Sequence, residues 1–222
     1  MEFPEGFNQL ELLESHGHMI PVGTESNWDE DEEDSEDEDD EGQQSEEWYQ
    51  EQELKRKDDP VGLMLWAAEK NRLSTVERLA ACDPSLINCH DDDGYTPLHR
   101  ASYNGHAPVV SFLLDSGADL HARTVDGWTP LHSASCWGHA AIVSCLLRRG
   151  SEVNAVTNSQ LTALQLAAEN PASPQTLELL LTRRTLQAGL RNAAGETAYD
   201  IAVRKTAHSG LFEIIEPCNN VH

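Results

Sequence analysis

Lysine and arginine are missing from the first 53 residues of this 222-residue chain. That stretch contains 21 of the 39 acidic residues, whereas residues 54 to 222 contain the other 18 acids and all 15 bases, so the formal charge of −24 divides into −21 and −3. A segment with this charge density buries too little apolar surface to offset the entropy of ordering it. The sequence therefore predicts a disordered acidic tail over residues 1–44.

Long apolar runs are also absent. No window approaches the roughly 20 apolar residues that a membrane-spanning helix needs, and the N-terminus has acids where a secretory signal has bases. We therefore expect a soluble protein of the nucleus or cytoplasm, without membrane contact. In a reducing compartment, an odd number of cysteines without a CxxC pair indicates free thiols. These are Cys82, Cys89, Cys136, Cys145 and Cys218.

Signatures of catalysis are missing as well. The chain has no P-loop, no glycine-rich phosphate fingerprint and no HExxH motif. Cys89, His90 and Asp91 are consecutive, but adjacent side chains point apart, and a catalytic triad is assembled from distant segments. The sequence predicts no catalytic residue and no cofactor, and hence a protein that is not an enzyme.

What the chain does contain is a repeated motif. The residues DGYTPLH at 93–99 recur 33 positions later as DGWTPLH at 126–132, and the frame continues at Thr162 and, 35 residues further on, at Thr197. The two extra residues of the last interval fall in the proline-containing segment 170–174. A degenerate first unit precedes these, with Asn71 at the position that Gly105 and Gly138 occupy in the next two units. The boundaries that we expect are a capping helix at 45–58, units at 60–90, 91–123, 124–156 and 157–191, a partial unit at 192–216 and a flexible C-terminus at 217–222.

Each recurring residue of the motif has a physical role. Thr96 and Thr129 are expected to cap helices, each followed by a proline at the first helical position, where a missing N–H costs nothing. Gly105 and Gly138 supply the positive φ of a turn into a second helix. The second helices carry apolar faces too wide to remain exposed, so neighbouring units must bury them against each other.

These residues resemble the ankyrin repeat family over residues ~60 to 216. The resemblance implies an all-α solenoid of helix-turn-helix pairs with hairpin fingers, which binds protein partners on its concave side. The layout of the whole chain resembles one group within that family, which implies an influence on gene expression and favours the nucleus. Histidine at the positions of His99 and His132 usually forms hydrogen bonds between units, and a spacing of roughly 8–10 Å is too long for a shared zinc ion.

Large side chains recur at positions that we expect to lie exposed on this concave side. Aromatic residues and arginine dominate interface energetics, so such a series suits a helical or extended peptide of a protein partner. The alternative is that the aromatic residue before each cap threonine only covers hairpin backbone. The candidate partner-binding residues are Tyr95, Arg100, Tyr103, Trp128, Trp137 and Leu161.

The acidic run at 29–41 has only Ser35 among twelve carboxylates. It should repel nucleic acid, and it acts either as a solubilising tail or as a binder of basic proteins such as histones. Ser35 resembles a substrate of acidophilic casein-type kinases. Upstream, Phe7, Leu10 and Leu13 have the spacing of a short helix that docks on a partner or folds back onto the repeats.

Two further expectations concern single sites. Trp48 and Leu54, in the helix before the first unit, should cover the open end of that unit. Asn154 resembles ankyrin asparagines that an oxygen-sensing hydroxylase modifies, so it is a second modification candidate beside Ser35. We expect a monomer.

Overall fold

The computed structural model describes residues 45–215, and Ser35, Cys218 and the acidic tail lie outside that range. The described residues confirm an all-α solenoid, with one isolated bridge between Val156 and Thr162. The elements are α2 (Glu46–Lys55), α3 (Pro60–Glu69), α4 (Leu73–Cys82), η2 (Pro84–Asn88), α5 (Pro97–Tyr103), α6 (Ala107–Asp115), α7 (Pro130–Cys136), α8 (Ala140–Arg148), α9 (Ala163–Glu169), α10 (Pro174–Leu181), α11 (Ala198–Lys205) and η3 (Ser209–Ile215).

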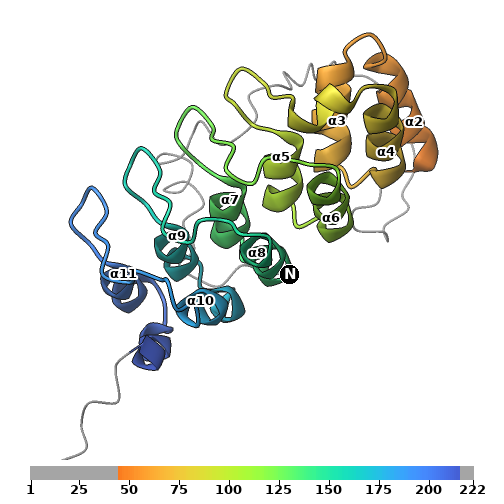
Figure 1. The fold of residues 1–222 in the computed structure, drawn as a ribbon. Helices are drawn as coiled ribbons and strands as arrows, with labels where there is room; N and C mark the ends of the chain where they lie inside the picture. The colour runs from red at the N-terminus through yellow and green to blue at the C-terminus, as the bar shows by residue number, and fades with distance from the viewer. Residues whose placement is uncertain (1–44, 216–222) are drawn as a thin grey trace, which may run out of the picture. The chain divides into compact units, whose positions relative to one another are not determined.

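The helices form two rows, as Figure 1 shows. The inner row is α3, α5, α7, α9 and α11, each packed on the next, and the outer row is α4, α6, α8 and α10. Hairpin-like fingers project from the same side of successive units, and their backbones are joined, for example from Val125 N to Asp93 O at 2.8 Å. We call the side formed by the inner helices and the fingers the finger face.

Capping threonines start the inner helices, as the sequence predicts. The hydroxyls of Thr96, Thr129, Thr162 and Thr197 each accept the backbone N–H three residues on, and the side chain of that third residue accepts the threonine N–H in return. This reciprocal arrangement satisfies two backbone donors that a helix start leaves without a partner. The third residue differs from unit to unit, being His99, His132, Gln165 and Asp200.

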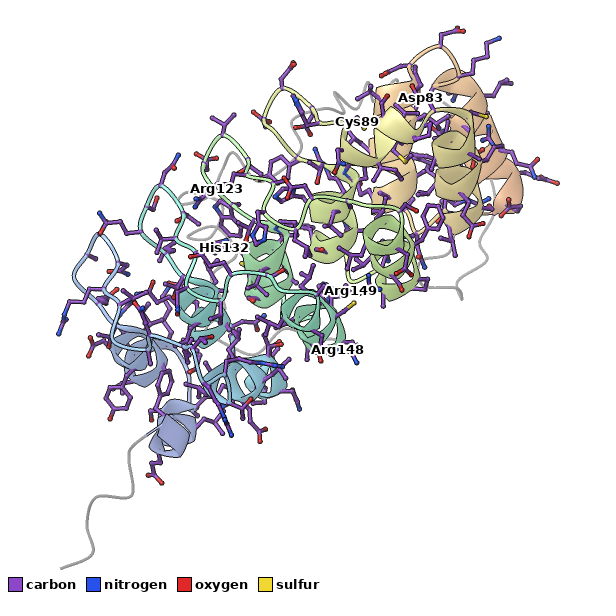
Figure 2. All side chains as sticks on the ribbon, viewed as in Figure 1. Asp83, Cys89, Arg123, His132, Arg148 and Arg149 are labelled. Carbon is purple, nitrogen blue, oxygen red and sulfur yellow. The ribbon has the colours of Figure 1, made fainter. Side chains whose placement is uncertain are left out.

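Hydrogen bonds from these third residues tie each unit to the next. Nε2 of His99 donates to the carbonyl of Trp128 at 3.1 Å, and Nε2 of His132 donates to that of Ala155 at 3.0 Å. Gln165 does the same through its amide, donating to the carbonyls of Leu190 and Glu196. Both imidazoles are buried, and Figure 2 shows His132 inside the array. Burial lowers the pKa of His99 and of His132 to about 4.

The turns between inner and outer helices use the left-handed conformation at the expected positions. Asn71 has φ of 57°, Gly105 of 82° and Gly138 of 76°, which confirms that the asparagine replaces a turn glycine in the first unit. At Gly138 the neighbouring unit also approaches closely, because a Cβ there would lie 1.5 Å from Oγ of Ser173. This position therefore excludes a side chain for two independent reasons.

Helix α2 covers the outer side of the first unit. Its Trp48 and Tyr49 pack on Trp66 of α3, with ring centroids 6.5 and 6.1 Å away. Within α2, Nζ of Lys55 lies 2.9 Å from Oε1 of Glu51, one helical turn away. Leu54 was expected to share the covering role, and this is wrong: it is 64% exposed because it lies on the side of α2 that faces solvent.

Candidate partner-binding face

The finger face carries one exposed aromatic pair. Tyr103 ends α5, Trp137 follows the end of α7, and their ring centroids lie 4.9 Å apart at an interplanar angle of 58°. The carbonyl of Tyr103 accepts a hydrogen bond from Nε2 of His139 at 2.9 Å, which fixes the end of α5 against the next unit. Trp137 is 38% exposed and Tyr103 is half-buried. A large aromatic surface therefore meets solvent on a rigid base.

Acidic residues stand in the same row on both sides of this pair. Glu69 ends α3 one unit before Tyr103, and Glu169 ends α9 one unit after Cys136. Nζ of Lys70 lies 2.9 Å from Glu69, and Nζ of Lys205 lies 3.2 Å from Glu169. The aromatic pair is thus flanked by carboxylates in exposed ion pairs, which water screens and which contribute little to stability.

Arg100 joins two units of the finger face. Its Nη2 lies 2.7 Å from Oδ2 of Asp91, its Nη1 lies 3.8 Å from Oε2 of Glu69, and its guanidinium lies 4.9 Å from the ring centre of Tyr95. A guanidinium above an aromatic face is held by the ring quadrupole as well as by its carboxylates. Arg100 is half-buried and already engaged, so its first role is to hold this part of the face in shape.

Tyr95 and Trp128 were expected either to be exposed to a partner or to cover hairpin backbone, and the structure contradicts the first of these alternatives. They are 8% and 3% exposed. Each ring packs edge-on against a buried imidazole of its own unit, Tyr95 on His99 at 5.9 Å and Trp128 on His132 at 6.1 Å. The residue before the cap threonine turns inward over the start of the helix, and burial raises the pKa of Tyr95 to about 12. These two side chains shield the inter-unit hydrogen bonds from water.

Leu161 occupies the equivalent position in the next unit and is half-buried. Its backbone is held on both sides, since its N–H donates to Oγ1 of Thr157 and its carbonyl accepts from Thr157 N. Of the six residues singled out in the sequence, Tyr103 and Trp137 are therefore brought together, whereas the others cover the helix starts or hold the fingers.

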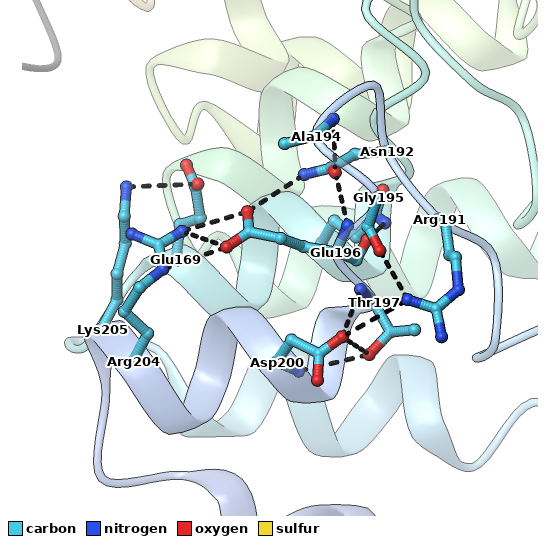
Figure 3. Close-up of polar contacts among 11 residues, drawn as sticks. Glu169, Arg191, Asn192, Ala194, Gly195, Glu196, Thr197, Asp200, Arg204 and Lys205 are labelled. Carbon is cyan, nitrogen blue, oxygen red and sulfur yellow. Dashed lines mark hydrogen bonds and ion pairs between the residues drawn. The ribbon is translucent and has the colours of Figure 1, made fainter.

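A polar network on the last unit was missed by the sequence analysis (Figure 3). Glu196 stands where Tyr95, Trp128 and Leu161 stand in earlier units, and both of its carboxylate oxygens accept from Arg204, at 3.1 Å. Lys205 pairs with Glu169 of the preceding unit. The alignment of Thr197 with Thr162 places Arg204 and Lys205 in the row of Tyr103 and Trp137, a signal in the sequence that was not used above.

The thiols of this region are poor nucleophiles. Burial raises the pKa of Cys136 to about 12 and that of Cys89 to about 11, so both are protonated at neutral pH. The four cysteines between residues 45 and 215 are free thiols. Within that range, no three histidine, cysteine, aspartate or glutamate side chains are grouped so that they could hold a metal ion.

Asn154 links the third unit to the fourth. Its Nδ2 donates to the carbonyl of Thr185 at 2.7 Å, and its Oδ1 accepts from the N–H of Gln187 at 2.8 Å. Asn88 makes the same two kinds of bond to Gly117 and Asp119. Both polar ends of the Asn154 amide are thus occupied, while its modification stays a prediction.

None of the helices in the described part of the chain has the length and apolar character to cross a membrane.

Comparisons with known proteins agree with this geometry. The family pattern described as ankyrin repeats (3 copies) matches residues 63–157. The chain is 59% identical over 220 residues to ankyrin repeat domain-containing protein 49 of Bos taurus and 57% identical over 224 residues to that of Homo sapiens. Both matches cover 99% of this chain and 91% of the relative. The protein of the same name in Drosophila melanogaster is 42% identical over 57 residues, 26% of each chain.

Proposed function

The chain belongs to the ankyrin repeat family, within the group of ankyrin repeat domain-containing protein 49, and from this premise we propose that it is a non-catalytic adaptor that binds a protein partner on its finger face. The observation that carries the proposal is the exposed pair of Trp137 and Tyr103, at the ends of α7 and α5 in two successive units. Influence on gene expression and the cellular compartment stay predictions.

The aromatic pair has the properties of an interface anchor. Tryptophan and tyrosine are enriched among the few residues that supply most of the binding energy of an interface. Here the two rings pack against each other at a tilt before any partner arrives, and the helix end beneath them is fixed by the hydrogen bond from His139. A partner that packs on a pre-ordered surface loses less entropy than one that must order it.

The surroundings of the pair indicate what kind of segment fits. Glu69 and Glu169 lie in the neighbouring units on either side, each in an exposed ion pair with a lysine. An apolar side chain would pack on Trp137, and polar or charged residues on either side would face these carboxylates and ammonium groups. A helical or extended peptide with an apolar centre meets this pattern.

Affinity purification of the full chain with Trp137→Ala tests the proposal. Truncating a tryptophan at the centre of an interface costs about 2 kcal/mol or more, so the affinity for the partner should fall roughly thirtyfold and its recovery should fall with it. Leu54→Ala is the matched control, because it removes an exposed apolar side chain from α2. Equal recovery with Trp137→Ala and with Leu54→Ala, at unchanged helicity, would remove the finger face from consideration.

A second candidate function is capture of basic proteins such as histones by residues 29–41. It is favoured by twelve carboxylates in thirteen residues. Such binding is screened by salt. Replacing those acids by their amides should abolish retention of a histone mixture at low salt. If retention survives that replacement, or does not weaken as salt rises, the acidic run is not the binding element.

A further inference from the structure

Three arginines have no ion-pair or hydrogen-bond partner among the described residues, namely Arg148, Arg183 and Arg184. Every other arginine between residues 45 and 215 donates to a carboxylate, a side-chain amide or a backbone carbonyl. Residues 54 to 222 contain 18 acids and 15 bases, so a shortage of carboxylates does not explain the three exceptions.

The three arginines stand at the ends of two neighbouring outer helices. Arg148 is the last residue of α8, and Arg183 and Arg184 follow the end of α10. Because α8 and α10 hold the same place in successive units and pack on each other, their C-terminal ends lie on the same side of the array, roughly 8–10 Å apart. Figure 2 shows Arg148 at this end of α8. We call Arg148, Arg183 and Arg184 the outer arginine patch.

Few acidic side chains surround this patch. Helix α8 contains no acid, and α10 contains one, Glu178, which lies one turn before its end. Asp115, at the end of α6, is held by Arg149, whose Nη2 lies 2.5 Å from its Oδ1. The ends of α8 and α10 therefore carry a local excess of positive charge in a chain whose formal charge is −24.

The helix ends themselves do not occupy these guanidinium groups. A basic side chain near a helix C-terminus is favoured by the helix dipole, and it can donate to the last carbonyls. Here those carbonyls are already bonded. The N–H of Ser151 donates to the carbonyl of Leu146 at 3.0 Å, and the hydroxyl of Thr182 donates to that of Leu179 at 2.8 Å. Most of the patch is exposed, so its N–H donors remain open to a ligand.

We propose that the outer arginine patch binds a phosphorylated segment of a protein partner. A guanidinium presents paired N–H donors that fit two oxygens of a phosphate, and a phosphoserine or phosphothreonine brings nearly two negative charges. One phosphate binds at Arg148 and another at Arg183 and Arg184. Residues three apart in an extended peptide are about 10 Å apart, which matches the spacing of the two helix ends. The segment therefore carries two phosphates three residues apart.

Other anionic partners fit the patch less well. A carboxylate carries about half the charge of a phosphate, and the carboxylates of the described residues leave these arginines unpaired. Nucleic acid and anionic membranes extend far beyond three side chains, so the negative charge of the rest of the chain would repel them. A short segment contacts the patch alone. The patch lies outside the finger face, so this inference does not depend on the aromatic pair.

Fluorescence anisotropy of the full chain with a labelled peptide tests the proposal. The probe is a glycine-rich peptide with two phosphoserines three residues apart, measured at low salt, where exposed charges are least screened. Saturable binding is expected. The same peptide with unmodified serines should not bind. A peptide with adjacent phosphoserines should bind about tenfold more weakly, because its phosphates reach only one helix end.

Substitutions that remove charge locate the binding. The patch variant combines Arg148→Gln, Arg183→Gln and Arg184→Gln, and it should weaken binding of the doubly phosphorylated peptide by about tenfold or more. Because Arg183 is half-buried, a second variant with only the other two substitutions guards against loss of helicity, which circular dichroism measures. The control variant removes the same charge from three exposed arginines elsewhere and should bind as the original chain does. These are Arg78, Arg191 and Arg204.

Several outcomes would overturn the proposal. One is no binding of the doubly phosphorylated peptide by the original chain, and another is equal weakening in the patch variant and the control variant. Equal affinity for the two phosphopeptides would contradict the role of both helix ends. Duplex DNA that competes as well as unlabelled peptide, at equal phosphate concentration, would show a general attraction for polyanions. Trp137→Ala should leave the affinity unchanged, and a tenfold loss would place the peptide on the finger face instead.

Discussion

Protonation of two buried histidines should destabilise the repeat domain in mild acid. The N–H of Thr96 donates to Nδ1 of His99 at 3.2 Å, and Nε2 of His99 donates onward to the next unit. Thr129 and His132 repeat this arrangement, with 3.1 Å from N to Nδ1. Nδ1 must therefore be unprotonated in the folded state, and a proton there would confront a backbone N–H with another donor.

The magnitude follows from the lowered pKa. In the folded chain both histidines titrate at about 4, below the ordinary value of 6.5, so the unfolded chain takes up protons first as the pH falls. Their contribution to stability is complete above pH 6.5 and is lost progressively toward pH 4. At pH 5 each histidine costs about 2 kcal/mol of unfolding free energy relative to pH 7.5, or about 4 kcal/mol together.

The chain itself provides the control. Gln165 holds the same place in the fourth unit, where its Oε1 accepts the N–H of Thr162 at 2.8 Å and its Nε2 donates to Leu190 O at 3.0 Å. A double variant, His99→Gln with His132→Gln, should keep this hydrogen-bond pattern and remove the titration. Urea unfolding followed by circular dichroism at pH 7.5 and pH 5.0 measures the difference.

The original chain should lose about 4 kcal/mol more than the double variant between these two pH values. Carboxylates titrate in both proteins, so the comparison cancels their contribution. If both proteins lose the same stability, the two histidines are not the acid-sensitive elements, and the argument from their burial and hydrogen bonds is refuted.

Gly138→Ala should destabilise the domain by several kcal/mol, because the positive φ of this residue disfavours a side chain and the new Cβ would clash with Ser173. Gly150→Ala should cost only about 1–2 kcal/mol, because φ is positive there too but no atom lies within 4 Å of the Cβ position. Thermal unfolding compares the two, and equal shifts would contradict the packing argument. Asn154→Ala should cost about 1–3 kcal/mol and speed hydrogen exchange in the following unit, because it removes two inter-unit hydrogen bonds. Intact-mass spectrometry of the cell-derived protein tests hydroxylation of Asn154, and a mass without added oxygen counts against it.

Much of the fold could be predicted because its signals are local. A cap threonine, a proline at the first helical position and a residue with positive φ each act within about four positions along the chain, so Thr129, Pro130 and Asn71 revealed their roles from spacing alone. The repeated interval then required that neighbouring units bury each other's apolar faces.

The candidate site was less predictable, because exposure depends on what a neighbouring unit covers. Tyr95 and Trp137 are both aromatic residues at recurring positions, and the sequence alone did not show that one turns inward onto an imidazole while the other remains in solvent. Likewise, Tyr199 follows the same pattern as the buried Leu164 but is 50% exposed. The order of residues determined where each helix begins and ends, since those interactions are short in sequence. Only the packing of one unit on the next decided which side chains remain available to a partner, because the covering atoms come from residues some 30 positions away.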